Sequence, residues 1–193
     1  MKVLVACEFS GVVRRAFREL GHDAYSCDLL PSEDRSEYHI QEDAFRVSYY
    51  DHWDLMIAHP PCTYLSVSGM HWTKRGLRDP KLTEDALDFV KLLMDAPIPK
   101  ICVENPVSII STRIRKPDQI VQPWMFGDDA SKKTCLWLKN LPLLQSTNII
   151  KKEIYANQTP SGQNKLGPSP DRQKERGRTY IGIALAMAAQ WGV

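Results

Sequence analysis

Apolar and polar residues follow one another along the first half of the chain in a pattern that predicts strands and helices in turn. Residues 2–7 (KVLVAC) form a continuous apolar run, which is typical of a strand buried on both faces. Residues 12–20 (VVRRAFREL) repeat apolar side chains at helical spacing and end before Gly21, a residue common just beyond a helix. Strands alternating with helices predict an α/β fold with a mostly parallel sheet. The further elements that the pattern predicts are strands at 23–30, 54–58 and 100–104 and a helix at 82–94, with Leu82, Ala86, Phe89 and Leu93 on one face.

The pattern becomes less regular after Pro106. Proline, glycine and serine accumulate over residues 159–170 (TPSGQNKLGPSP), which predicts a long surface loop. With 193 residues, of which 43% are hydrophobic, the chain is long enough for one compact domain with a sizeable core. We therefore expect residues 1–193 to form a single domain.

Composition limits the compartment and the chemistry. The apolar run at the N-terminus is interrupted by Glu8, so it is too short for a signal peptide or a membrane span, and we expect a cytoplasmic protein. The five cysteines are widely spaced and odd in number, which favours reduced thiols over a disulfide framework. Neither they nor the five scattered histidines show the spacing of a metal site. We expect no metal and no membrane partner.

Basic residues concentrate in the C-terminal part of the chain. The formal net charge is +2, but residues 1–110 carry 12 basic and 17 acidic side chains, whereas residues 111–193 carry 13 and 6. Such a basic segment can neutralise the phosphates of a nucleic acid. A solvated charged surface explains the charge equally well when it is taken alone.

Candidate ligand-binding residues follow the predicted strands, because ligands of open parallel sheets bind beyond the carboxyl ends of the strands. After the first strand, Gly11 can turn tightly and present backbone amides at a helix start. Asp28 follows the second strand, 17 residues beyond Gly11, close to the spacing at which a carboxylate binds ribose hydroxyls. An ordinary loop aspartate is the alternative for Asp28. The segments HPPC, residues 59–62, and NP, residues 105–106, follow the third and fourth strands.

Two of these segments resemble motifs of the DNA cytosine-5 methyltransferase family. PPCTYLSVSG is similar to its Pro-Pro-Cys motif, in which a serine and a glycine follow the cysteine as Ser66 and Gly69 follow Cys62. VENP resembles its Glu-Asn-Val motif, about forty residues downstream, with Glu104 and Asn105 matching and proline replacing valine. The resemblance covers about the first 110 residues and points to small phage and bacterial members without a full target-recognition domain. It implies the Rossmann-like S-adenosylmethionine-dependent methyltransferase fold, with helices on both faces of a mostly parallel sheet.

The resemblance also implies a covalent mechanism. Cys62 would add its thiolate to C6 of cytosine and thereby make C5 nucleophilic. Glu104 would be the acid that protonates N3, a role for which its pKa would need to be raised. The two prolines restrict the backbone before Cys62 to extended conformations, so the thiol can be held rigidly. A buried loop cysteine without chemistry is the alternative for a cysteine considered by itself.

The implied cofactor is S-adenosylmethionine. Asp28 would hold the ribose, Asp43 in QEDAF would contact the adenine, and the FSG segment would form the cofactor loop. The family's glycine two positions beyond Gly11 is missing, since Val12 and Val13 stand there. The residues assigned to the cofactor are Phe9, Ser10, Gly11, Asp28, Asp43 and Pro60, with a simple core position as the alternative for Phe9.

The implied substrate is DNA, with RNA less favoured. Residues 111–177 form only a reduced substrate-recognition region, in which Trp124 and Trp137 are candidates for stacking on a base, although core positions are the commoner fate of tryptophan. The arginines of ERGRTYIG keep the spacing of a family motif that contacts the base, and a second alignment assigns residues 180–188 to the closing glycine-rich motif. The alternative for Arg176 and Arg178 is that they are ordinary exposed charges. The residues assigned to the substrate are Pro61, Ser66, Asn105, Arg176 and Arg178.

Two other functions stay open beside DNA cytosine-5 methylation. The same thiol addition could act on RNA or on a free pyrimidine nucleotide. A catalytically silent nucleic-acid-binding relative is the third possibility, although the presence of both Cys62 and Glu104 argues against it. Amino-methyltransferases also use a Pro-Pro loop, but theirs ends in an aromatic residue, so the cysteine disfavours methylation of an exocyclic amine.

Overall fold

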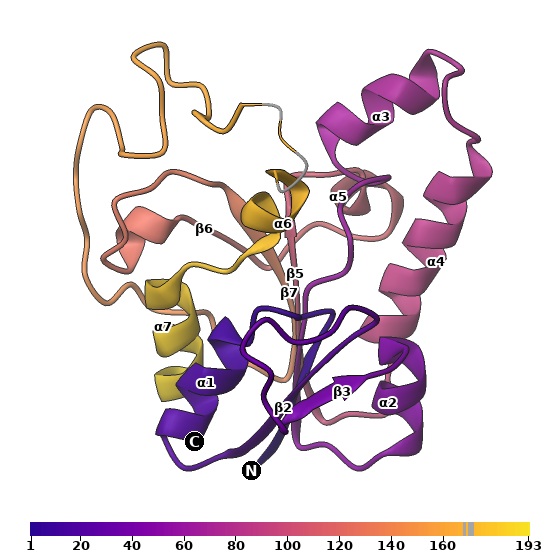
Figure 1. Ribbon diagram of the computed structural model, residues 1–193, viewed down its shortest axis with the longest axis vertical. Coiled ribbons are helices and arrows are strands. Elements are labelled where there is room, and N and C mark those ends of the chain that lie inside the picture. Colours follow the sequence, from indigo (N-terminus) through magenta and orange to yellow (C-terminus); the bar gives the residue numbers. More distant parts are fainter. Residues whose placement is uncertain (168, 170–171) are drawn as a thin grey trace.

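A mixed β-sheet forms the centre of the structure (Figure 1). The computed structural model describes residues 1–167, 169 and 172–193, and within them seven strands form one sheet in the order β3-β2-β1-β4-β5-β7-β6. The strands are β1 (Lys2–Ala6), β2 (Asp23–Asp28), β3 (His39–Gln41), β4 (Leu55–Ala58), β5 (Lys100–Pro106), β6 (Gln119–Val121) and β7 (Thr134–Lys139). The helices are α1 (Val12–Glu19), α2 (Ala44–Tyr50), α3 (Val67–Lys74), α4 (Lys81–Met94), α5 (Ile110–Arg113), α6 (Arg172–Gly177) and α7 (Ile181–Trp191), with a 3-10 turn η1 (Pro123–Met125).

The first five strands are parallel, and β7 is inserted antiparallel between β5 and β6. The predicted Rossmann-like α/β fold with a mostly parallel sheet is therefore confirmed. A fold of this kind supports many activities, so the activity has to be argued from the site.

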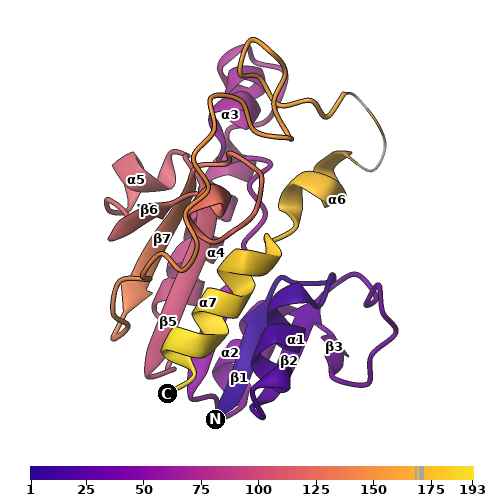
Figure 2. The ribbon, with the colours of Figure 1, turned by 90° about the vertical axis from the view of Figure 1, so that its left-hand side faces the viewer.

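Helices cover both faces of the sheet (Figures 1 and 2). The helices α1 and α7 pack against each other on one face, and α2 and α4 cover the other. Along β1, Val3 and Val5 belong to the core under α1 and α7, while Leu4 and Ala6 belong to the opposite core. Successive strand side chains point to opposite faces, so a strand buried on both faces has to be apolar throughout.

The helix predicted at 82–94 is α4, and its predicted face agrees in part with the core: Leu93 is buried, and Ala86 and Phe89 pack against the core from its edge. The buried side chains are Thr83, Leu87, Val90 and Leu93, whereas Leu82 is 40% exposed. Both sets of positions fit the helical repeat, and only packing against β5 and α2 selects between them.

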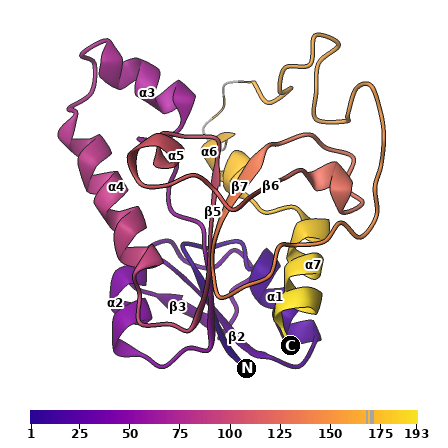
Figure 3. The ribbon, with the colours of Figure 1, turned by 180° about the vertical axis from the view of Figure 1, so that it is seen from behind.

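After β5 the chain adds the strands β6 and β7, which pair antiparallel, and no further parallel strand among the described residues. Residues 159–167 and 169 contain neither helix nor strand, in agreement with the predicted loop, while Pro168 and Pro170 lie outside the described residues. No helix in the described part of the chain has the length and apolar character that crossing a membrane requires. Both termini lie at the end of the sheet opposite α3 (Figures 1 and 3).

Candidate active site

The Pro-Pro-Cys segment leaves β4 at the carboxyl end of the sheet, beside the end of β5. Ala58, the last residue of β4, pairs with Val103 of β5. The main-chain N–H of His59 donates to the carbonyl of Ala6 at 2.9 Å, which extends the pairing of β4 with β1 by one residue. The parallel register therefore brings the Pro-Pro-Cys segment next to Glu104, despite the long separation of the two in the sequence.

Asn105 fastens this segment to β5. Its Nδ2 donates a hydrogen bond of 2.7 Å to the carbonyl oxygen of Pro60, and both residues are buried. The Oδ1 atom of Asn105 is also buried, and it has no hydrogen-bond partner within the described residues. Pro61 is exposed, so the two prolines, predicted to contact cofactor and substrate respectively, lie in different surroundings.

Glu104 is buried at the end of β5 and is bonded to a histidine. The Nδ1 atom of His59 lies 2.8 Å from Oε2 of Glu104. Burial alone would raise the pKa of Glu104, but the bond from His59 and the nearby charge of Lys132 hold this pKa below its ordinary value. The structure therefore contradicts the raised pKa that the sequence reasoning required for Glu104. The prediction failed because the sequence does not show that His59 and Lys132 lie beside this carboxyl group.

Cys62 is half-buried, and neighbouring charged groups shift the pKa of its thiol in opposite directions. Burial raises the pKa of its thiol, the charges of Lys132 and Arg176 lower it, and Glu104 raises it. Lys132 also donates from Nζ to the carbonyl oxygen of Arg176 at 2.9 Å, which links the segment before β7 to α6. Lys132 was not among the predicted site residues, and its only signal was membership of the basic C-terminal part.

The spacing of Cys62, Ser66 and Gly69 has an explanation in α3. Ser66 is the N-cap of this helix, and its Oγ accepts a hydrogen bond of 3.2 Å from the main-chain N–H of Gly69. A Cβ atom on Gly69 would lie 2.1 Å from the carbonyl oxygen of Thr63, so only glycine lets the helix approach so closely. The structure therefore gives Ser66, predicted to bind substrate, a part in shaping the turn after the cysteine.

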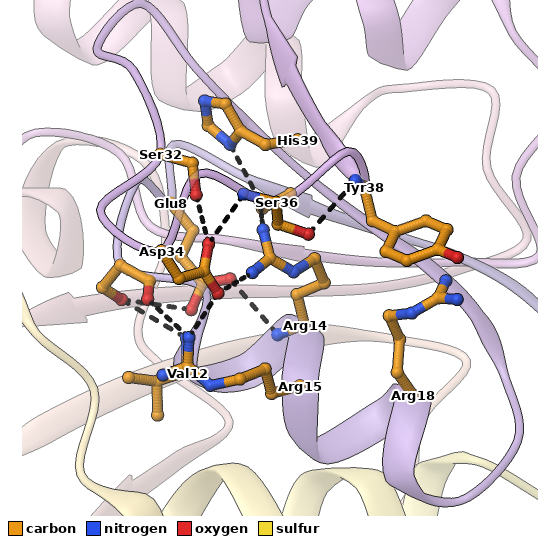
Figure 4. Close-up of polar contacts among 12 residues, drawn as sticks. Glu8, Val12, Arg14, Arg15, Arg18, Ser32, Asp34, Ser36, Tyr38 and His39 are labelled. Atoms are coloured by element: carbon orange, nitrogen blue, oxygen red, sulfur yellow. Dashed lines mark hydrogen bonds and ion pairs between the residues drawn. The ribbon is translucent and has the colours of Figure 1, made fainter.

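The turn between β1 and α1 is closed by side chains of the protein itself (Figure 4). The carboxylate of Glu8 accepts hydrogen bonds from the main-chain N–H groups of Val13 and Arg14 at 2.7 and 3.2 Å. Ser10 is buried and donates to the same carboxylate at 3.4 Å. Gly11 has φ +68°, and a Cβ there would meet the guanidinium of Arg14 at 2.4 Å. These two first-turn amides, expected to face a ligand, are therefore already bonded.

Two arginines of α1 form an ion-pair cluster outside this turn (Figure 4). The buried guanidinium of Arg14 donates to Ser26 at 2.8 Å and pairs with Asp34, which Arg15 contacts at 2.7 Å. Burial would raise the pKa of Asp34, but hydrogen bonds from Ser32 and both arginines hold it far below its usual range. A hollow of about 460 Å³ lies beside this cluster. Because Asp34 already neutralises much of the positive charge, we assign no anion to it.

Asp28 and Asp43 lie near the end of β1. Asp28 pairs with Gln41 in the register of β2 and β3, and Asp43 follows Gln41 by two residues. Burial raises the pKa of the Cys7 thiol, and the charges of Asp28, of a neighbouring thiol and of Asp43 raise it further. Oδ1 of Asp28 accepts from the N–H of Leu30, and Oδ1 of Asp43 accepts from the N–H of Phe45, both at 2.9 Å. The two acids predicted to hold ribose and adenine are therefore brought together by the fold.

The C-terminal segment reaches back over the predicted cofactor loop. Phe9 is half-buried, and Nζ of Lys174 lies 5.3 Å from the centre of its ring. The carboxylate of Glu33, whose main-chain N–H donates to the carbonyl of Phe9 at 3.0 Å, pairs with Arg178 at 2.7 Å and with Lys174 at 3.9 Å. Arg178, predicted to contact the base, is thus engaged by an acid of the loop after β2.

The two tryptophans considered as base-stacking residues occupy different places. Trp137 lies in β7, is 1% exposed and donates from Nε1 to the carbonyl of Arg115, so it belongs to the core. Trp124 is half-buried and stacks on Tyr155, with ring centres 6.3 Å apart. Among the described residues, no three or more His, Cys, Asp or Glu side chains are grouped closely enough to hold a metal ion.

Several solved structures resemble this chain in fold. No protein-family model and no curated protein matches this chain. A solved structure that resembles it is a prophage-encoded protein of E. coli with the provisional description of a DNA modification methyltransferase. The two share 14% sequence identity with a TM-score of 0.49, over 78% of this chain and 52% of the other. The chain thus spans about half the length of that protein.

Proposed function

We propose that this protein transfers a methyl group from S-adenosylmethionine to C5 of cytosine in DNA, with Cys62 as the covalent nucleophile. The observation that carries the proposal is the grouping at the switch point of the sheet. From β1 the chain adds β2 and β3 toward one edge of the sheet, and then β4 and β5 toward the other edge, so β1 and β4 flank the switch point. Ligands of such sheets bind in the crevice at this point. Two carboxylates, Asp28 and Asp43, lie on the β1 side, and the Cys62 thiol and the Glu104 carboxyl lie on the β4 and β5 side.

The residues on the β1 side suit a nucleoside cofactor. Asp28 and Asp43 each bond one main-chain amide through Oδ1, so within the described contacts each leaves Oδ2 for a ribose hydroxyl or an adenine amine. The half-buried ring of Phe9, in the turn after β1, offers a flat apolar surface. S-adenosylmethionine, when bound, supplies an electrophilic methyl group on a sulfonium that departs as a neutral thioether.

The residues on the β4 and β5 side suit addition to a pyrimidine ring. The thiolate of Cys62 forms a bond to C6, while N3 takes a proton from Glu104 and the C5–C4 bond gains enamine character. C5 then bonds the methyl carbon. When C5 afterwards loses its own proton to a base, the bond from sulfur to C6 breaks, N3 returns its proton, and the aromatic ring and the Cys62 thiolate are restored. The hydrogen bond from Asn105 to Pro60 holds the sulfur in place during these steps.

Positive groups near Cys62 favour its ionisation to the thiolate that attacks C6. Because the pKa of Cys62 is raised, a thiol that meets its substrate near neutral pH is mostly protonated. Lys132 and Arg176 both oppose this shift, and their charges would be felt more strongly once a bound base excludes water. We assign the stabilisation of the thiolate to Lys132, with Arg176 of α6 as a second contributor.

DNA is the preferred substrate because of the basic C-terminal part. Phosphate contacts from such a region position a nucleic acid but carry no sequence information. Residues 111–177 contain few candidates for reading base edges, and Trp137 is unavailable because it is buried. We therefore expect loose sequence recognition and a preference for cytosines that are already unpaired, since flipping a paired base costs a few kcal/mol.

The test is methyl transfer from labelled cofactor to unmodified DNA, followed by mass spectrometry of the nucleosides. We expect 5-methylcytosine with the parent protein and none with Cys62→Ser, because a serine hydroxyl is not ionised near neutral pH. DNA that contains 5-fluorocytosine should trap a covalent adduct at Cys62, since fluorine blocks the final loss of the C5 proton. Cys135→Ser is the matched control, because that thiol is buried in β7.

Each alternative has a distinct outcome in this test. Methylation of RNA or free nucleotide in preference to DNA would keep the chemistry and replace the substrate. Binding of nucleic acid without methylation of any of them would identify a silent relative. A Cys62→Ser variant that methylates DNA within about tenfold of the parent rate would reject the covalent mechanism.

A further inference from the structure

His59 is the direct partner of Glu104, and no motif of the sequence drew attention to it. Its Nδ1 lies 2.8 Å from Oε2 of Glu104, and the two side chains are 7% and 9% exposed. Its second ring nitrogen, Nε2, is buried and has no hydrogen-bond partner within the described residues. A buried imidazole with an unpaired nitrogen is costly, so a structural role alone accounts poorly for a histidine here.

The position of the Pro-Pro-Cys segment does not need this imidazole. The main-chain N–H of His59 extends the β4 pairing, and the side chain of Asn105 holds the carbonyl of Pro60. Either bond would form with many other residues at position 59. The bond of the imidazole itself goes to the carboxylate of Glu104, which is the acid of the proposed chemistry.

We propose that His59 is a positioning residue that orients Glu104 and holds the proton which Glu104 passes to N3 of the cytosine. This inference rests on the proposed function. When Cys62 adds to C6, the proton on Nδ1 of His59 moves to Oε2 of Glu104, and the carboxyl group formed in this way passes that same proton to N3 and returns to the carboxylate. The imidazolium becomes neutral, N3 becomes protonated, and both changes reverse when the thiolate leaves.

The other groups that face this pair are poorly suited to hold that proton. The thiols of Cys62, Cys102 and Cys135 all have raised pKa values, chiefly through burial, so they keep their own protons. Lys132, from the segment before β7, contributes a positive charge that favours the ionised form of Glu104. Histidine is the side chain that ordinarily gains and loses a proton near neutral pH.

The first experiment follows methyl transfer as a function of pH in substituted proteins. His59→Asn keeps an N–H donor near the place of Nδ1 but cannot carry an additional proton, whereas His59→Phe removes both properties. His52→Asn is the matched control, because His52 is exposed and remote in sequence from Glu104. We expect kcat of His59→Asn to fall at least about tenfold near pH 7.5 with KM little changed.

The pH profile separates a proton-holding role from a structural one. His59 supplies a hydrogen bond and a charge that lower the pKa of Glu104, so their loss in His59→Asn should move the alkaline limb of kcat away from its parental position, whereas a merely structural role would lower kcat and leave the limb in place. If His59→Asn restored the parental kcat and profile that His59→Phe had lost, His59 would be only a hydrogen-bond donor and the proposal would be overturned.

A second measurement does not depend on catalysis. In the parent protein, proton NMR should show a downfield Nδ1–H resonance that disappears in His59→Asn and moves upfield in Glu104→Gln. Its absence from the folded parent would overturn the inference even if the enzyme methylates DNA. If the resonance is present but no cytosine substrate forms an adduct or is methylated, the proposed function fails while the His59–Glu104 pair stands.

Discussion

Replacing Asn105 by alanine tests how the segment that carries Cys62 is held. The substitution removes the bond of 2.7 Å from Nδ2 to the carbonyl oxygen of Pro60, which has no second hydrogen-bond donor among the described residues. Asn105 is 1% exposed and Pro60 is buried, so water cannot readily replace the lost donor. The variant therefore leaves a buried acceptor without a partner.

The expected cost follows from three contributions. Loss of the bond costs about 1 kcal/mol net, and the orphaned carbonyl costs roughly 1–3 kcal/mol. Removal of the Oδ1 atom, which is itself buried without a partner among the described residues, offsets part of this. We therefore expect a loss of about 2 kcal/mol in the free energy of unfolding and a Tm lower by roughly 4–8 °C.

Urea unfolding followed by tryptophan fluorescence measures this change. Asn140→Gly is the matched control, because Nδ2 of Asn140 bonds the carbonyl of Pro99 at 2.8 Å in an exposed setting. Glycine is used there because Asn140 has φ +52°, where alanine would add strain. We expect the control to lose about 0.5 kcal/mol or less. Equal losses in the two variants would refute the reasoning, since burial would then not matter.

Three other predictions address the cofactor side, the turn after the cysteine and the state of the thiol. Asp28→Ala should weaken S-adenosylmethionine binding by about 1.5–3 kcal/mol in calorimetry, and unchanged affinity would remove Asp28 from the site. Gly69→Ala should lower Tm and methyl transfer together, because its Cβ would lie 2.1 Å from the carbonyl of Thr63; a variant as stable and active as the parent would contradict this contact. Because the pKa of Cys62 is raised, its alkylation rate, followed by mass spectrometry, should keep rising with pH beyond the range of an ordinary thiol, and Lys132→Met should move the midpoint higher still. A midpoint at or below the ordinary thiol value would contradict the burial of Cys62.

The local order of elements could be predicted because it depends on short-range patterns. The apolar run at residues 2–7 became β1, and the helical repeat at residues 12–20 became α1, with Gly21 in a left-handed conformation just beyond it. The antiparallel β7 was not predicted, since its direction depends on pairing with β5 and not on its own residues. The core-facing side of α4 was predicted only in part for the same reason, because packing buried Leu93 and placed Ala86 and Phe89 against the core but left Leu82 exposed.

The candidate site was accessible from the sequence where its residues stand in compact motifs. Cys62 with its prolines and Glu104 with Asn105 could be named, and the parallel register of β4 and β5 then placed them side by side. The spacing to Ser66 and Gly69 was visible as well. Its physical reason, a capped helix packed on the carbonyl of Thr63, required coordinates.

The sequence by itself determined which elements form and which residues bear chemistry, because strand and helix patterns and the two short motifs are local properties. Only the tertiary structure decided the pKa values of the residues that bear this chemistry, Glu104 above all. His59 and Lys132 stand beside Glu104, so its pKa is lowered although burial alone would raise it. Arg178 is paired with Glu33, 145 residues away in the chain, and so is drawn to the loop after β2. Such contacts depend on strand register and on loops meeting across the sheet, and charge interactions between residues far apart in sequence leave no periodic trace in it.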